Sequence, residues 1–74
     1  MKITVKLVGA FRVGRFKEDV REYPPSTRVR EVVEDLQVSQ NLLGAVLIND
    51  VHAGFDSMLH DGDRLCLLPF MDGG

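Results

Sequence analysis

The chain opens on a strict alternation of polar and apolar residues. Ile3, Val5 and Leu7 fall on one side of this alternation, and polar residues fall on the other. A period of two is typical of a β-strand that buries one face, so we expect a strand over residues 2–8. Val8 departs from the pattern, because it places an apolar side chain on the polar side of that strand.

A second pattern, with helical spacing, follows Ser26 and Thr27, two residue types that commonly cap the start of a helix. Its apolar members lie at i, i+3, i+4 and i+7, which is the stripe of an amphipathic helix. We therefore expect one helix of about ten residues, packed on a sheet through this stripe. The stripe consists of Val29, Val32, Val33 and Leu36.

Shorter apolar runs and turn residues define the other strands. We expect a weak strand ended by Pro24-Pro25, an apolar strand, a short strand after a tight Asn49-Asp50 turn, and a last strand after Asp61-Gly62-Asp63. These strands cover residues 18–23, 45–48, 51–53 and 64–69. Strands on both sides of one helix predict an α+β fold, with a mixed sheet of four to five strands and the helix across one face.

The chain length of 74 residues fits one domain, 1–74, with residues 70–74 as its C-terminal tail. The formal net charge of −2 argues against nucleic-acid binding. Arg12, Arg15 and Lys17 are expected to belong to a solvated loop, since acidic residues follow them directly. No apolar run approaches the roughly 20 residues of a membrane span, and the first residues lack the apolar segment of a signal peptide. We therefore expect a cytoplasmic protein with no membrane partner.

Few residues are candidates for chemistry within the domain. Cys66, the one cysteine, is expected to be a buried or half-buried thiol in the last strand rather than a nucleophile. His52 and His60 have no partner ligands at metal spacing, so no metal or cofactor is expected to bind this chain. Asp61 and Asp63 fit a hairpin turn better than an acid–base pair. These residues do not indicate an autonomous enzyme.

The two final residues are Gly73 and Gly74. Without side chains they form a narrow, conformationally free thread, which can enter a partner's active site and present the Gly74 carboxylate. A carboxylate is inert toward sulfur nucleophiles until one oxygen becomes a good leaving group, which favours adenylation by ATP followed by acyl transfer. A frayed terminus is the alternative, and the two glycines by themselves favour it.

Taken together, the segments of the chain resemble the sulfur-carrier family of molybdopterin synthase small subunits and thiamine-pathway carriers, known as MoaD and ThiS. The resemblance covers essentially the whole chain. The last turn, the last strand and the terminal Gly-Gly at this spacing are jointly its most specific part. Its marks are the opening strand, Phe11-Arg12, Gly14 to Glu18, Ser26-Thr27 before Val29 to Leu36, Val46 to Asn49, Asp61 to Asp63, and Pro69 to Gly74.

This resemblance implies a ubiquitin-like β-grasp fold and a carrier that is not itself an enzyme. It implies that a ubiquitin-activating-type adenylating enzyme uses ATP and magnesium to activate the Gly74 carboxylate. Sulfur from a persulfide then replaces AMP to give a thiocarboxylate. In the molybdopterin branch the tail enters the large subunit of a molybdopterin synthase, in which this chain is the non-catalytic small subunit. The long first loop and the Pro69 stem resemble that branch more than the thiamine branch.

Two positions depart from the commonest family pattern. Asp50 replaces the usual turn glycine, and Asp72 adds a negative charge beside the tail. Asp72 bears on which activating enzyme accepts the chain, because the phosphates of ATP are also negative. Three alternatives stay open: a thiamine-pathway carrier, a ubiquitin-like modifier joined to lysines of target proteins, and a β-grasp interaction module with an idle tail.

Strand phasing also predicts a partner-binding surface. With the alternate residues of the last strand facing the core, Cys66 and Leu68 face outward beside Val8. Phe70 and Met71 continue this exposed apolar strip towards the tail. Exposed apolar patches mark protein interfaces. We therefore expect Val8, Leu68, Phe70 and Met71 to bind partner proteins, unless the chain's own loops cover them.

Overall fold

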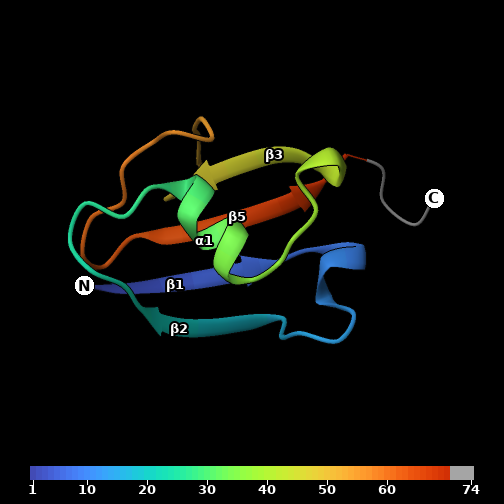
Figure 1. The fold of residues 1–74 in the computed structure, drawn as a ribbon, viewed down its shortest axis with the longest axis horizontal. Coiled ribbons are helices and arrows are strands. Elements are labelled where there is room, and N and C mark those ends of the chain that lie inside the picture. The colour runs from blue at the N-terminus through green and yellow to red at the C-terminus, as the bar shows by residue number, and fades with distance from the viewer. Residues whose placement is uncertain (71–74) are drawn as a thin grey trace.

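The computed structural model, which describes residues 1–70, has a five-stranded sheet. Figure 1 shows the α-helix lying across one face of this sheet. The strands are β1 (Lys2–Leu7), β2 (Glu18–Glu22), β3 (Leu43–Ile48), β4 (Val51–His52) and β5 (Arg64–Pro69), and the helix is α1 (Val29–Asp35). Two short 3₁₀ helices, η1 (Gly9–Arg12) and η2 (Gln40–Leu42), precede β2 and β3. The expected α+β fold, with its helix on one face of a mixed sheet, is confirmed.

The first and last strands lie side by side in the sheet. The strand order is β2-β1-β5-β3-β4, and β1 and β5 are parallel whereas the other neighbouring pairs are antiparallel. Because β1 and β5 run in the same direction, β5 ends on the side of the sheet opposite to Met1 (Figure 1). Phe70, the base of the C-terminal tail, therefore lies at the same end of the sheet as η1, which contacts β5.

The core forms where α1 meets the sheet, and the strand phasing predicted from the sequence is correct. Ile3, Val5 and Leu7 of β1 are at most 1% exposed, as are Leu65 and Leu67 of β5. Burial of side chains of this size contributes about 1.5–3 kcal/mol each, so the alternation decides which face of the sheet α1 covers. The fully buried residues that α1 adds to this core are Val29, Val32 and Val33.

The helix begins later than the sequence predicts. It has seven residues instead of about ten, and its N-cap is Arg28 rather than Ser26 or Thr27. Ser26 adopts a positive φ of 69° in the preceding turn. The hydroxyl of Thr27 donates to the carbonyl oxygen of Pro24 at 2.7 Å instead of capping the helix. The carboxylate of Glu31 accepts a hydrogen bond from the N–H of Arg28 at 2.9 Å and caps the first turn.

The helix ends in a Schellman motif, in which the chain reverses through a left-handed residue. Gln37 supplies this conformation with a φ of 56°. The N–H of Val38 donates to the carbonyl oxygen of Val33 at 3.1 Å, and the N–H of Gln37 donates to that of Glu34 at 3.0 Å. These two bonds satisfy carbonyl groups that the last helical turn would otherwise leave unpaired.

Arg15 joins the first loop to this helix end. Its Nε donates to the carbonyl oxygen of Leu36 at 3.0 Å, and its Nη2 donates to that of Gln37 at 2.7 Å. Its Nη1 donates to the carbonyl oxygen of Phe11 at 3.3 Å. A positive charge at a helix C-terminus also interacts favourably with the helix dipole. Arg15 is exposed in the loop, as expected, but its guanidinium also binds carbonyl groups of two segments, which the sequence did not predict.

We expect Arg15→Met to lower the free energy of unfolding by about 1–2 kcal/mol, since it removes three hydrogen bonds of a charged donor at a partly solvated site. In a domain of this size, the melting temperature should fall by roughly 4–16 °C, as measured by circular dichroism. Arg12→Met is the matched control, because it removes the same charge from the same loop but none of these hydrogen bonds. Equal melting temperatures for the two variants would contradict this role of Arg15.

Candidate functional site

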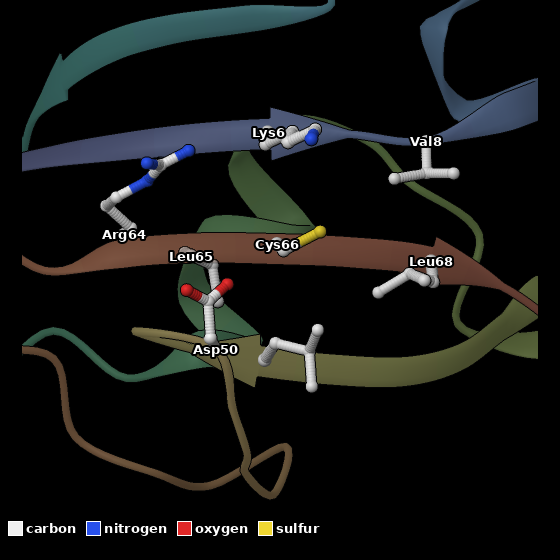
Figure 2. Close-up of a pocket in the computed structure, with 8 residues that line it drawn as sticks. Lys6, Val8, Asp50, Arg64, Leu65, Cys66 and Leu68 are labelled. Carbon is white, nitrogen blue, oxygen red and sulfur yellow. The ribbon is translucent and has the colours of Figure 1, made fainter.

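The face of the sheet that α1 leaves open carries the outward-facing residues of β1 and β5 (Figure 2). Lys6 of β1 pairs with Cys66 of β5, and Cys66 pairs with Leu47 of β3. Side chains directly opposite on neighbouring strands share a face, so these three lie together. Val8 and Leu68 lie beside one another further along the same face, towards the end of β5 (Figure 2).

A depression with a volume of about 220 Å³ lies on this face. Pockets that enclose small-molecule substrates are usually larger, roughly 300–1,000 Å³, so the depression suits contact with a protein better than it suits a substrate. A second depression, of about 270 Å³, is lined by Gln40, Leu43 and Phe55 and brings together no titratable side chain. The lining of the first depression consists of Lys6, Val8, Leu47, Asp50, Arg64, Leu65, Cys66 and Leu68.

The apolar strip is less exposed than the sequence suggests. Val8, Cys66 and Leu68 face outward as expected but are half-buried, whereas Phe70 is 73% exposed. The half-burial arises because side chains on adjacent strands shield one another across the sheet. The strip thus runs from the middle of the open face to the base of the tail, and its role in binding stays a prediction.

Charged side chains lie at the end of the apolar strip that is farther from the tail (Figure 2). Lys6, Arg64 and Asp50 line the same depression, and Arg64 lies 3.5 Å from the carboxylate of Glu18. Both side chains of this ion pair are half or more exposed, so the pair contributes at most about 1 kcal/mol. Apolar residues bordered by charged, solvated side chains are common in protein interfaces.

Cys66 lies among these charges, yet its thiol is not activated. Burial raises the pKa of the Cys66 thiol, as does the carboxylate of Asp50, and this outweighs the lowering effect of Lys6 and Arg64. The thiolate is the nucleophilic form of cysteine, so a raised pKa keeps Cys66 largely protonated at neutral pH. The structure therefore agrees with the interpretation of Cys66 as a half-buried, unreactive thiol.

The two aspartates of the turn before β5 support the fold rather than form an acid–base pair. Asp63 is 9% exposed, and its carboxylate accepts hydrogen bonds from the side-chain amide of Asn49 at 2.9 Å and from the N–H of His60 at 2.8 Å. Asp61 accepts a hydrogen bond from the N–H of Lys2 at 2.7 Å. From the sequence we assigned Asn49 only to the turn after β3. The hydrogen bond that joins it to Asp63, in the turn before β5, was not predicted, because no local sequence signal indicates it.

The base of the tail is attached to β3. Pro69 pairs with Leu43, and the N–H of Phe70 donates to the carbonyl oxygen of Leu42. The tail therefore starts from a defined place at the end of the sheet. The remaining predicted site residues lie outside the described part of the chain: Met71, Asp72, Gly73 and Gly74.

Within residues 1–70, no group of three or more histidine, cysteine, aspartate or glutamate side chains is placed to hold a metal ion. The described helices are too short and too polar for any of them to cross a membrane.

Comparison with solved structures finds the same fold in several small proteins. A protein from Pyrococcus furiosus described as molybdopterin converting factor subunit 1 is 24% identical, with a TM-score of 0.75 over 93% of this chain and 97% of that chain. SAMP1 from Haloferax volcanii is 19% identical, with a TM-score of 0.76 over the whole of both chains. A chain in the complex of subunits 1 and 2 of the molybdopterin-converting factor from Helicobacter pylori 26695 is 22% identical, with a TM-score of 0.67 over both whole chains. Likeness at these identities establishes the fold.

The family assignment comes from the sequence pattern rather than from these neighbours. No curated protein matches the chain significantly. The pattern of the ThiS family, however, matches residues 5–74. This match includes the second half of β1, all later elements, and both Gly73 and Gly74. The resemblance to the MoaD and ThiS group is thereby confirmed, and the chain belongs to the ThiS family.

Proposed function

We propose that this protein is a sulfur carrier that is activated at the carboxylate of Gly74. The observation that carries the proposal is the ThiS family match, which runs through Gly73 and Gly74. The fold supports it, because β5 leads from the interior of the sheet directly to Phe70 and the tail. The folded domain thus serves to bind partners and to present its own terminus to them. The catalytic groups belong to these partners.

The chemistry follows from the reactivity of a carboxylate. In the first step, a carboxylate oxygen of Gly74 attacks the α-phosphate of ATP, which the adenylating enzyme holds with magnesium, and pyrophosphate leaves. In the second step, a donor persulfide attacks the carbonyl carbon of the acyl adenylate, and AMP leaves to give an acyl disulfide. A thiol then attacks the donor's sulfur, forms a disulfide with the donor, and leaves a thiocarboxylate on Gly74.

The open face of the sheet supplies the contact with partners. The apolar strip ends at Phe70, so a partner seated on the strip also faces the tail. The first partner is the adenylating enzyme, and the second is the large subunit of a molybdopterin synthase-type enzyme. The Helicobacter pylori structure contains subunits 1 and 2 of a molybdopterin-converting factor in one complex, which supports a large-subunit partner here. The two partners bind in turn, because one tail cannot occupy two active sites at once.

Incubation with the adenylating enzyme, ATP, magnesium and a persulfide donor is expected to raise the intact mass by the difference between one sulfur and one oxygen. Fragmentation by mass spectrometry should place this change at Gly74. Cys66→Ser is the matched control, since it removes the one cysteine of the chain and should be modified at Gly74 to the same extent. A mass shift located at Cys66, or one that survives removal of the tail, would contradict the proposal.

A ubiquitin-like modifier is the second candidate, favoured by the likeness to SAMP1, a small archaeal modifier protein. The same activation would then precede transfer of Gly74 to a lysine amine. Tagged conjugates in cell extract would support the modifier. Restored synthesis of molybdenum cofactor in a strain that lacks its own carrier, without conjugates, would support the sulfur carrier. Restored synthesis of thiamine instead would show that the carrier donates its sulfur in the thiamine pathway.

A further inference from the structure

The strands β3 and β5 pair with an irregular register close to the base of the tail. Leu43 is opposite Pro69, and Ala45 is opposite Leu68. Two steps along β3 therefore correspond to one step along β5, which leaves Gly44 as the extra residue of a β-bulge. Bulges bend a strand locally, and they are frequent next to functional sites.

The backbone of Phe70 passes so close to Gly44 that no side chain fits between them. A Cβ atom on Gly44 would lie 2.5 Å from the Cα atom of Phe70, 2.8 Å from its N atom, and 3.0 Å from the carbonyl carbon of Pro69. Real Cβ atoms essentially never come closer than 3.0 Å to another heavy atom, and ordinary van der Waals contact begins at 3.4 Å, so the backbones of Gly44 and Phe70 would have to move apart by about 0.5–0.9 Å. The three obstructing atoms belong to the backbone and cannot turn aside as the end of a flexible side chain can.

A hydrogen bond holds Phe70 in this close approach. The N–H of Phe70 donates to the carbonyl oxygen of Leu42, the last residue of η2. Displacement of Phe70 away from Gly44 changes the geometry of this hydrogen bond. The bond is then weaker, because the strength of a hydrogen bond falls steeply once its geometry departs from the optimum. The absence of a side chain at Gly44 allows the backbone of Phe70 to lie in this position, and the hydrogen bond to the carbonyl oxygen of Leu42 holds it there.

We propose that Gly44 is a positioning residue for the tail, which acts through Phe70 to place the Gly74 carboxylate for adenylation. This inference rests on the proposed function, and Gly44 itself touches no substrate. Four residues lead from Phe70 to Gly74, and an extended chain spans at most about 3.3–3.6 Å per residue, so the carboxylate stays within roughly 14 Å of Phe70. The partner's active site fixes where the carboxylate reacts and Phe70 fixes where the tail begins, so a shift of Phe70 changes the distance that these four residues must span.

The test is Gly44→Ala, with Gly54→Ala as the matched control, because a Cβ atom on Gly54 would meet only the hydroxyl oxygen of Ser57, at 3.7 Å. The first readout is amide hydrogen exchange by NMR. The Phe70 amide should exchange at least about tenfold faster in Gly44→Ala, since its hydrogen bond is weakened, and at the parent rate in Gly54→Ala.

The second readout is ATP–pyrophosphate exchange with the adenylating enzyme at varied concentrations of the carrier. A reacting atom displaced by about 1 Å can cost roughly a hundredfold in rate. Because the tail absorbs part of the shift, we expect kcat of Gly44→Ala to fall by about tenfold or more. KM should stay within about twofold, since Val8, Cys66 and Leu68 of the apolar strip are not touched by the substitution. A purely structural defect would alter the folded fraction and not separate kcat from KM in this way.

A second pair of variants applies if Gly44→Ala does not fold. Phe70→Pro removes the N–H that bonds to Leu42, and Phe70→Ala removes the same side chain but keeps the N–H. We expect kcat of Phe70→Pro to be the lower of the two. Unchanged kcat for Gly44→Ala, or equal kcat for the two Phe70 variants, would overturn the proposal. If the unmodified protein supports no exchange, the proposed function fails instead, and the amide measurement still decides whether Gly44 holds Phe70.

Discussion

Deletion of Gly74 is expected to abolish ATP–pyrophosphate exchange and to leave the melting temperature unchanged. The buried apolar core lies within residues 3–67 and strand pairing ends at Pro69, so the deletion removes no described contact. The shortened chain still ends in a carboxylate, but this group falls one residue short, by about 3.3–3.6 Å. A displacement of about 1 Å can already cost roughly a hundredfold in rate, so we expect a loss at least that large.

Gly74→Ala is the matched control for the deletion, because it keeps both the length of the chain and the terminal carboxylate. It should melt at the same temperature and retain far more exchange activity than the shortened chain. Thermal melts and exchange rates are best measured side by side on the same preparations. Normal exchange by the shortened chain would show that the terminus is not the working group, and the sulfur-carrier proposal would fall.

A charge placed in the apolar strip is expected to produce the second largest effect. Leu68→Asp and Phe70→Asp should each weaken binding to the adenylating enzyme by about 2 kcal/mol or more, roughly thirtyfold. The reason is that docking would bury an unpaired carboxylate. Phe70 is 73% exposed, so its variant should melt within a few degrees of the parent protein. Leu68 is half-buried, and its variant should melt earlier, so calorimetric titration belongs at a temperature where both are folded.

Val20→Asp is the matched control for these two variants. Val20 is 59% exposed and pairs with Thr4 on the open side of the sheet, so it shares the face with the apolar strip but is not part of it. The substitution adds the same charge to the same face and should leave the affinity for the adenylating enzyme unchanged. Equal weakening by Val20→Asp would show that net charge or the whole face controls docking, and not the strip.

Local sequence pattern was sufficient to predict a structural feature wherever that feature depends only on residues that are close in the sequence. The alternation of Ile3, Val5 and Leu7 predicted the buried face of β1, because successive side chains of any strand point to opposite faces. The turn at Asn49-Asp50 was predicted for a similar reason. Both residues have positive φ, 52° and 67°, which asparagine and aspartate tolerate better than most residues.

The start of α1 shows why other features were not predictable. The N–H groups of Val29 and Arg30 donate to the carbonyl oxygens of Ser57 at 3.0 Å and Phe55 at 2.9 Å. The loop before β5 thus satisfies N–H groups of the first helical turn, and Arg28, directly before the helix, is extended. Ser26 and Thr27 have good capping propensity, but tertiary hydrogen bonds decide where the helix begins.

The sequence by itself therefore determined the buried face of the central strands and the presence of one helix on the sheet. It also determined the family of the chain, whose pattern includes the two terminal glycines. Only the tertiary structure decided that Arg15 binds the end of α1, that Leu68 is half-buried, and that Gly44 lies against the base of the tail. Each of these depends on groups from segments distant in sequence, which only the folded chain brings into contact, and no local propensity encodes such a contact.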